Sequence, residues 1–316
     1  MSRLFRDVEG GPLCPQGSVV CIGAFDGLHL GHRALVHRAV ERARALDVPA
    51  VALTFEPLPR EFFAPAQKPP RLTLARAKFE GLRDNGIDLV GLLRFNGKLA
   101  SMDAERFVRE VLVGRLQARE VWIGPDFRFG KGRAGDLTLL RELGESLGFT
   151  AHAIHPVVVD GERVSSTRIR EALTVGDFDT VERLLGRRYA IAGRVVRGKQ
   201  LGRTLGYPTA NLRYGNKRPP LQGIYATRVH GVGTQPIASV SSFGTRPTVA
   251  GIEPLLEAHL FDFDGDLYGQ RIAVEFVARL RDELAFADLP ALVAQMHRDA
   301  EQARDLLSTS KQQACA

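Results

Sequence analysis

The sequence of 316 residues has few cysteines and no long apolar run. Its three cysteines, Cys14, Cys21 and Cys315, have neither the spacing of zinc ligands nor that of a disulfide framework. No apolar run approaches the roughly 18 residues that cross a bilayer, and residues 1–18 contain no apolar segment typical of a secretory signal. We therefore expect a cytoplasmic globular protein that does not act at a membrane.

Acidic side chains are absent from residues 187–252, which contain eleven Lys and Arg. Residues 253–316 contain six basic and twelve acidic residues, whereas residues 1–186 are nearly balanced, with 26 basic and 24 acidic. No lysine-rich tail or basic stripe with interleaved aromatics accompanies the net charge of +7, so we expect no nucleic-acid partner. The chain length and this change in character predict two domains, residues 1–186 and 187–316.

The GxxxxGK[ST] motif of P-loop kinases is also absent, but residues 23–32 read GAFDGLHLGH. They lie between an apolar run, residues 19–22, and a helical pattern that begins near Ala34. The unpaired N–H groups at the start of a helix favour phosphate, and Gly27 allows close approach of a ligand to the backbone. Because His29 and His32 are three apart, both can donate to one phosphate group. This stretch predicts a triphosphate site.

The first half alternates apolar runs with amphipathic helical patterns, which predicts a doubly wound parallel α/β sheet of the Rossmann-like type. The expected strands are residues 19–22, 50–55, 87–93, 120–124 and 149–159. Ligands of such sheets lie outside the carboxyl ends of the strands. Loops at two of these ends, residues 56–63 and 125–133, combine arginines with aromatic rings and can flank a flat ring together with a phosphate.

The second half consists of short apolar runs separated by glycine, proline and charged turns, which predicts an antiparallel β-barrel. The expected strands are residues 189–196, 223–229, 237–240, 255–261 and 272–276. Apolar residues at helical spacing over residues 289–307 predict a C-terminal helix packed on the barrel.

Three side chains of the second half are candidates for chemistry. Thr209 and Asn211 are two apart in an extended segment, so their side chains point the same way. Their oxygens can then ligate one hard cation such as Mg²⁺. Glu257 is a charged residue within an apolar strand, which suits a general base.

Residues 23–32 resemble the HxGH signature of the adenylyl-transferring nucleotidyltransferases. Their GxFDGxHxGH form resembles the N-terminal half of the prokaryotic bifunctional riboflavin kinase/FMN adenylyltransferases, also called FAD synthetases. Residues 124–135, GPDFRFGKGRAG, are similar to the GxDFxFGxxRxG loop of that family, and residues 165–170, SSTRIR, are similar to its ISSTxIR element. The family usually carries histidine where Leu58 stands.

The resemblance implies that His29, His32 and Arg168 neutralise charge during adenylyl transfer. The ATP contacts that it implies in this half are Gly23, Phe25, Gly27, His29, His32, Ser165, Ser166, Thr167 and Arg168. The flavin contacts expected here are Asp26, Pro57, Arg60, Phe62, Asp126, Phe127, Phe129 and Arg133.

The second half resembles the riboflavin kinase module of the same family. The motifs GRTLGYPTANL, GTRPT and EAHLFDFDGDLYG occur in the family's order, with Ser242 at a position that often holds asparagine. The resemblance implies that Thr209 and Asn211 bind Mg²⁺–ATP and that Glu257 deprotonates the ribityl 5′-hydroxyl. It also implies a loop over the ATP phosphates, with contacts from Gly198, Lys199, Gly202, Arg203 and Gly206.

The family's activity implies a two-site enzyme with Mg²⁺ as cofactor and ATP as co-substrate. Riboflavin and ATP would give FMN in the second domain, and FMN and ATP would give FAD and pyrophosphate in the first, with FMN and FAD bound as products. An alternative is an adenylyltransferase for another phosphorylated small molecule, with the barrel as a flavin- or RNA-binding regulatory module. We expect a monomer or a weak homo-oligomer.

Overall fold

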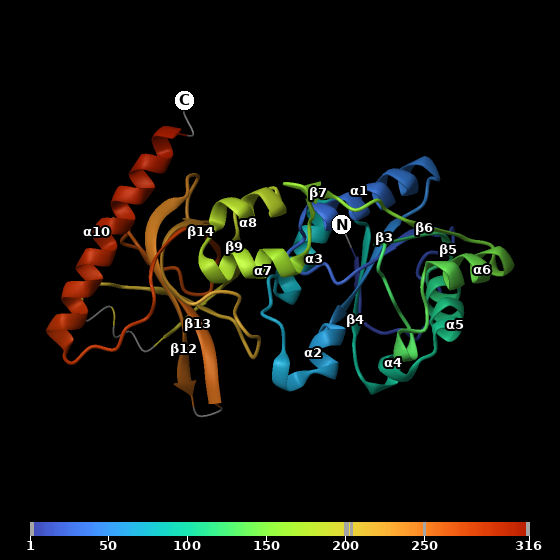
Figure 1. Ribbon diagram of the computed structural model, residues 1–316, viewed down its shortest axis with the longest axis horizontal. Helices are drawn as coiled ribbons and strands as arrows, with labels where there is room; N and C mark the ends of the chain where they lie inside the picture. Colours follow the sequence, from blue (N-terminus) through green and yellow to red (C-terminus); the bar gives the residue numbers. More distant parts are fainter. Residues whose placement is uncertain (1–2, 199–201, 203–204, 249–250, 314–316) are drawn as a thin grey trace. The chain divides into compact units, whose positions relative to one another are not determined.

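The computed structural model describes residues 3–198, 202, 205–248 and 251–313. The chain packs into two compact units, each with its own sheet (Figure 1). The first unit comprises Met1–Pro69 and Thr73–Ser166, and the second comprises Pro70–Leu72 and Thr167–Ala316. The residues between Ser166 and the predicted boundary at residue 186 group with the second unit. A functional division at that boundary stays a prediction.

A six-stranded parallel sheet forms the centre of the first unit, with the strand order β1-β4-β3-β2-β5-β6. The strands are β1 (Arg3–Phe5), β2 (Ser18–Ile22), β3 (Ala50–Glu56), β4 (Leu89–Arg94), β5 (Ala118–Ile123) and β6 (Thr150–Ala153). The predicted parallel α/β fold is confirmed. Strand β1, which was not predicted, extends the sheet at β4.

Alternate residues of the central strand β2 pack on opposite faces of this sheet. Val19 and Cys21 contact the core beneath α1 and α3, whereas Val20 and Ile22 contact the core on the side of α5 and α6. The helices of this unit are α1 (Leu30–Ala45), α2 (Pro59–Phe63), α3 (Ala75–Asp84), α4 (Gly97–Ser101), α5 (Ala104–Phe107) and α6 (Leu137–Leu147). A π-helical segment, Val108–Arg115, continues α5, and 3-10 turns occupy Pro65–Gln67 and Lys131–Arg133.

The predicted strand over residues 149–159 is wrong in extent. Strand β6 ends at Ala153, and the chain then forms a separate antiparallel hairpin of β7 (Val158–Val159) and β8 (Glu162–Arg163). The turn between them places Asp160 at φ 55° and Gly161 at φ 77°, left-handed conformations that Asp and Gly adopt more readily than other residues.

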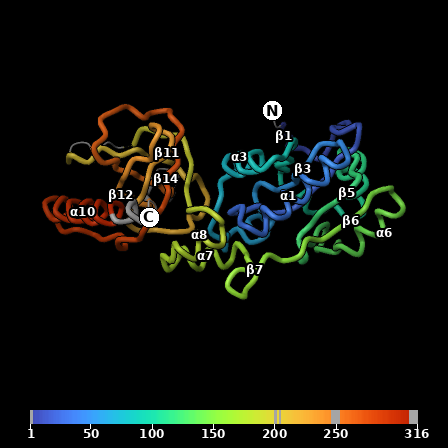
Figure 2. Tube along the Cα trace, turned by 90° about the horizontal axis from the view of Figure 1, so that it is seen from above, coloured from blue at the N-terminus to red at the C-terminus, as the bar shows by residue number. Residues whose placement is uncertain are grey.

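The predicted antiparallel barrel is confirmed, and it is closed, with the strand order β10-β13-β12-β11-β14-β9. Its strands are β9 (Ala190–Val196), β10 (Ala210–Arg213), β11 (Gly223–His230), β12 (Ile237–Thr248), β13 (Gly251–Leu260) and β14 (Arg271–Arg281). Helices α7 (Ser166–Val175) and α8 (Phe178–Leu185) precede it. Helix α10 (Leu289–Gln313) lies along β11, β12 and β14 (Figure 2). Its residues Ala300, Ala303 and Leu307 are buried. Among the described residues, no helix is both long enough and apolar enough to cross a membrane.

A buried polar relay anchors the turn that follows β2. The Thr54 hydroxyl, on β3, donates to the backbone carbonyl of Ala24 at 3.0 Å. The same oxygen accepts a hydrogen bond from Nζ of Lys78, on α3, at 3.3 Å, and both side chains are fully buried. This relay connects the glycine-rich turn to a strand and a helix of the rigid core.

Replacement of Thr54 by valine is expected to lower the melting temperature. The change keeps the shape but removes the donor to Ala24, and a buried polar group that loses its partner costs about 1–3 kcal/mol. Calorimetric unfolding of T54V beside the T54S control, which retains the hydroxyl, measures the effect. A T54V protein as stable as the parent would contradict this role.

Candidate active sites

His29 closes the first turn of α1 and is the N-cap residue of that helix. Its Nδ1 accepts a hydrogen bond from the backbone N–H of His32 at 3.3 Å. A neutral imidazole whose Nδ1 accepts carries its proton on Nε2, so the ring is a donor at its other edge. The rings of His29 and His32 stack with centroids 3.7 Å apart. The sequence prediction that the two histidines act at one place fits this geometry.

The SSTRIR segment begins beside the same turn. The Ser166 hydroxyl, at the start of α7, donates to the carbonyl of Asp26 at 2.8 Å. Ser165 directly precedes it, and the next residues, Thr167 and Arg168, begin the second unit. The convergence of Arg168 with the two histidines stays a prediction.

The side chain of Asp26 links the turn that follows β2 to Thr73. Its buried carboxylate accepts a hydrogen bond from the backbone N–H of Thr73 at 2.9 Å, and the Thr73 hydroxyl accepts one from Gly27 N–H at 2.9 Å. Gly27 has φ 89°, a conformation that favours glycine. The contacts therefore give Asp26 a structural part, while its predicted contact with flavin stays untested.

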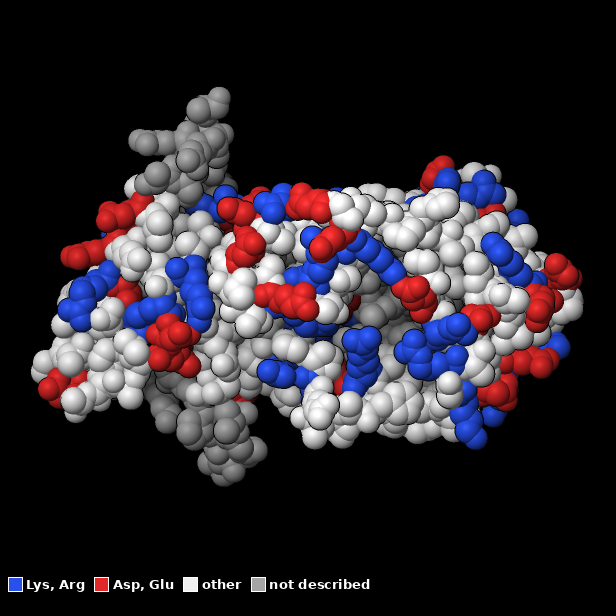
Figure 3. Space-filling view, in the orientation of Figure 1, with Lys and Arg blue, Asp and Glu red and all other residues white. Residues whose placement is uncertain are grey.

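A cavity of about 940 Å³ opens at the carboxyl ends of β3, β4 and β5. Figure 3 shows basic side chains gathered beside a hollow in the surface near α2 and α4. Five predicted flavin contacts line the cavity, namely Arg60, Asp126, Phe127, Phe129 and Arg133. Aromatic walls with a basic rim suit a planar ring that carries a phosphate.

Phe62 and Pro57, which were also predicted to contact flavin, are not among the described residues that line this cavity. The Phe62 ring packs against that of Phe95 with centroids 5.4 Å apart, and Phe95 lines the cavity. Pro57 precedes α2 and is not among the described lining residues. Leu58 is buried and its backbone N–H donates to the Glu61 carboxylate at 2.9 Å, so the α2 loop is held without the histidine usual in the family.

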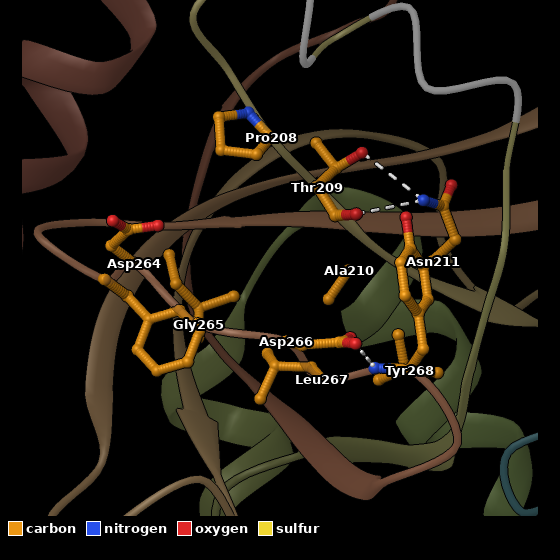
Figure 4. Close-up of a pocket in the computed structure, with 12 residues that line it drawn as sticks. Pro208, Thr209, Ala210, Asn211, Asp264, Gly265, Asp266, Leu267 and Tyr268 are labelled. Atoms are coloured by element: carbon orange, nitrogen blue, oxygen red, sulfur yellow. Dashed lines mark hydrogen bonds between the residues drawn. The ribbon is translucent and has the colours of Figure 1, made fainter.

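In the second unit, Thr209 and Asn211 flank the start of β10, at the edge of a cavity of about 520 Å³ (Figure 4). The Asn211 amide nitrogen donates to the Thr209 carbonyl at 3.1 Å, with the Thr209 hydroxyl 3.4 Å away. A Cβ at Gly198 would lie 2.9 Å from the Asn211 side chain, so any other residue there would displace the Asn211 amide. Lys199 and Arg203 of that loop lie outside the described residues.

The barrel register places Glu257 directly opposite Asn211. In the β10–β13 pairing these two residues are partners, and in the β12–β13 pairing Glu257 faces Ser242. Directly opposed residues of an antiparallel pair project to the same side. Glu257, Ser242 and Thr209 line a second cavity of about 400 Å³, and Thr209 also lines the first. The predicted base and the predicted metal ligands therefore meet where two cavities adjoin.

The donor set at Thr209 and Asn211 fits a hard cation held partly by substrate. The Oδ1 atom of Asn211 is buried and has no hydrogen-bond partner among the described residues. The described part of the chain also contains no cluster of three or more His, Cys, Asp or Glu side chains that could hold a metal ion without other ligands. Mg²⁺ commonly takes few protein oxygens together with substrate phosphates, which matches this arrangement.

Known proteins match the chain over both units. The FAD synthetase family profile matches residues 12–168, and the riboflavin kinase profile matches residues 185–307. The bifunctional riboflavin kinase/FMN adenylyltransferase of Escherichia coli strain K12 is 42% identical over 310 residues, covering 98% of this chain and 99% of its own. The chain belongs to the bifunctional riboflavin kinase/FMN adenylyltransferase family. Its relative in Pseudomonas fluorescens is 46% identical over 297 residues, 93% of this chain and 94% of the relative.

A solved structure shares the fold of this family member. A crystal structure named "Macrolide-efflux Protein", from Streptococcus pneumoniae, superimposes with a TM-score of 0.75 at 30% identity. The match covers 96% of this chain and 98% of that one. The shared architecture therefore spans the α/β unit and the barrel.

The cavities also include residues outside the predicted contacts, of which Phe63, Arg128 and Lys131 lie in the two loops predicted to flank the flavin and Phe95 does not. Phe63, Phe95, Arg128 and Lys131 line the large cavity of the first unit. Asp264, Asp266 and Tyr268 line the cavity beside Thr209 (Figure 4). Phe95 directly follows the carboxyl end of β4, so the rule that ligands gather at strand ends could have found it.

Proposed function

We infer that the chain is a riboflavin kinase and FMN adenylyltransferase, which produces FMN and FAD. Family membership over nearly the whole chain supports both activities. It also favours this assignment over an adenylyltransferase for a different acceptor or an RNA-binding barrel. The structural observation that carries the kinase is the register that brings Glu257 opposite Asn211, beside Thr209.

For phosphorylation we assign residues 187–316, with Glu257 as the general base. Its carboxylate accepts the proton of the ribityl 5′-hydroxyl as that oxygen attacks the γ-phosphorus of ATP, and ADP leaves. Thr209 and Asn211 would hold Mg²⁺ through their side-chain oxygens. When bound, the ion would neutralise charge on the ATP phosphates. We place riboflavin in the cavity that Glu257 lines and ATP in the cavity lined by Asn211 and Tyr268.

For adenylyl transfer we assign residues 1–186. A phosphate oxygen of FMN attacks the α-phosphorus of ATP, and pyrophosphate leaves without a covalent enzyme intermediate. His29, through its Nε2 proton, His32 and Arg168 donate to phosphate oxygens as charge develops, and the N-terminus of α1 adds its partial positive charge. The isoalloxazine ring would lie among Phe127, Phe129 and the rings of the α2 loop.

Purified protein incubated with riboflavin, ATP and Mg²⁺ should convert riboflavin to FMN and then to FAD, as separated by chromatography. Supplied FMN should yield FAD and pyrophosphate without a lag. Absence of both products from a folded, Mg²⁺-supplied protein would contradict the assignment. A cytoplasmic location and a monomeric or weakly associated state stay predictions from the sequence.

A further inference from the structure

We propose that His259 and His297 brace Tyr207 and Pro208, and that this histidine brace positions Thr209 and Asn211 for the metal-bound nucleotide. Neither histidine is among the residues that the sequence motifs single out for chemistry. The inference rests on the kinase function proposed above. It adds two positioning residues that act through the backbone which precedes the metal ligands.

His259 holds the peptide bond that leads into Thr209. It lies two residues beyond Glu257 on β13, hence on the same side of the strand, and lines the same cavity. Its Nδ1 atom lies 2.9 Å from the carbonyl oxygen of Pro208. Because a carbonyl only accepts, Nδ1 carries the proton and donates. That carbonyl belongs to the same planar peptide group as the nitrogen of Thr209, so the bond fixes the orientation of the group.

His297 holds Tyr207, the residue that precedes Pro208. The Tyr207 hydroxyl lies 2.6 Å from Nδ1 of His297, which comes from helix α10. The Tyr207 ring also packs against His259, with centroids 4.9 Å apart. One strand and one helix thus hold two consecutive residues.

The segment before Thr209 needs such a brace because its glycine leaves the backbone dihedral angles free to vary. Gly206, with φ 80°, directly precedes Tyr207. Among the residues described in the preceding turn, Leu205 N–H and Tyr207 N–H both donate to the Gly202 carbonyl. Beyond the brace, the Asn211 amide takes its orientation from the Thr209 carbonyl at 3.1 Å. A displaced Thr209 therefore carries Asn211 with it.

The test compares substitutions at His259 by the Mg²⁺ dependence of riboflavin phosphorylation. Asparagine places an N–H donor close to the position of Nδ1, whereas glutamine places it where Nε2 lies and leucine has none. We expect H259L and H259Q to raise the Mg²⁺ concentration for half-maximal rate about tenfold, equivalent to one lost hydrogen bond. H259N should stay within about threefold of the parent. The maximal rate at saturating Mg²⁺ should fall less than the Mg²⁺ affinity.

Two further measurements separate this inference from the function on which it rests. N211A should lose phosphorylation at every Mg²⁺ concentration, and an N211A protein with a parental Mg²⁺ response would overturn the proposed metal site itself. If N211A is inactive while H259L and H259Q keep the parental Mg²⁺ curve, the brace is wrong. Should H259L fail to fold, the contrast between H259N and H259Q decides, and equal Mg²⁺ curves for those two overturn the proposal. Adenylylation of supplied FMN reports that each variant chain is intact.

Discussion

Replacement of Glu257 by glutamine is expected to lower the rate of FMN formation from riboflavin by about 10²–10⁴-fold, the usual contribution of a general base. Glutamine keeps the size of the side chain but cannot take the proton of the ribityl hydroxyl. Adenylylation of supplied FMN should continue at the parental rate, because Glu257 lies in the barrel. Separate assays with riboflavin and with FMN as substrate measure both rates.

A second barrel carboxylate provides the matched control. Glu275, on β14, is largely buried and bonds to His230 at 2.9 Å, away from the cavities that Glu257 and Asn211 line. E275Q should therefore retain riboflavin phosphorylation. Equal losses in E257Q and E275Q would mean that the effect comes from damage to the barrel and not from a missing base.

Replacement of His29 is expected to have the converse effect and to lower the rate of FAD formation from FMN by about 10²–10³-fold. This is the usual cost of removing one preorganised hydrogen-bond donor to a developing charge. Phosphorylation of riboflavin should continue. Asparagine is the informative substitution because it is among the preferred N-cap residues. H29N thus preserves the start of α1 while removing the Nε2 donor. R168A is expected to show the same loss.

The control for this experiment lies on the same helix. His37 is exposed on α1, where its Nε2 lies 3.0 Å from the side-chain oxygen of Asn85. H37A should retain both activities. If H29N or R168A instead stopped both reactions in a folded protein, the division of labour between the two halves would be wrong.

Much of the fold could be predicted because its signals are local. The apolar run before Gly23 is buried on both faces, as its composition indicated, and the short runs after residue 187 form the expected barrel. Strand β1, three residues long, has no such signal and exists because β4 offers it an edge. Lys78 is also unexpected, since lysine is rarely buried. Its bond to Thr54 depends on packing between α3 and β3 that no local pattern shows.

The candidate site was likewise predictable only where its signal is local in the sequence. Thr209 and Asn211 could be paired from the sequence because two-residue spacing in an extended segment sets their direction. Their meeting with Glu257 depends on the β10–β13 register, which joins residues far apart in the chain. The acidic turn after β13 gave no local sign of its position beside Thr209, because only closure of the barrel brings them together.

The central claim is that two distinct ATP sites act in succession on one flavin, and labelled ATP tests it most directly. With riboflavin as substrate, ATP labelled at the γ-phosphorus should yield labelled FMN and then labelled FAD. ATP labelled at the α-phosphorus should label FAD but never FMN. Label from the α-position in FMN, or FAD without it, would contradict the account.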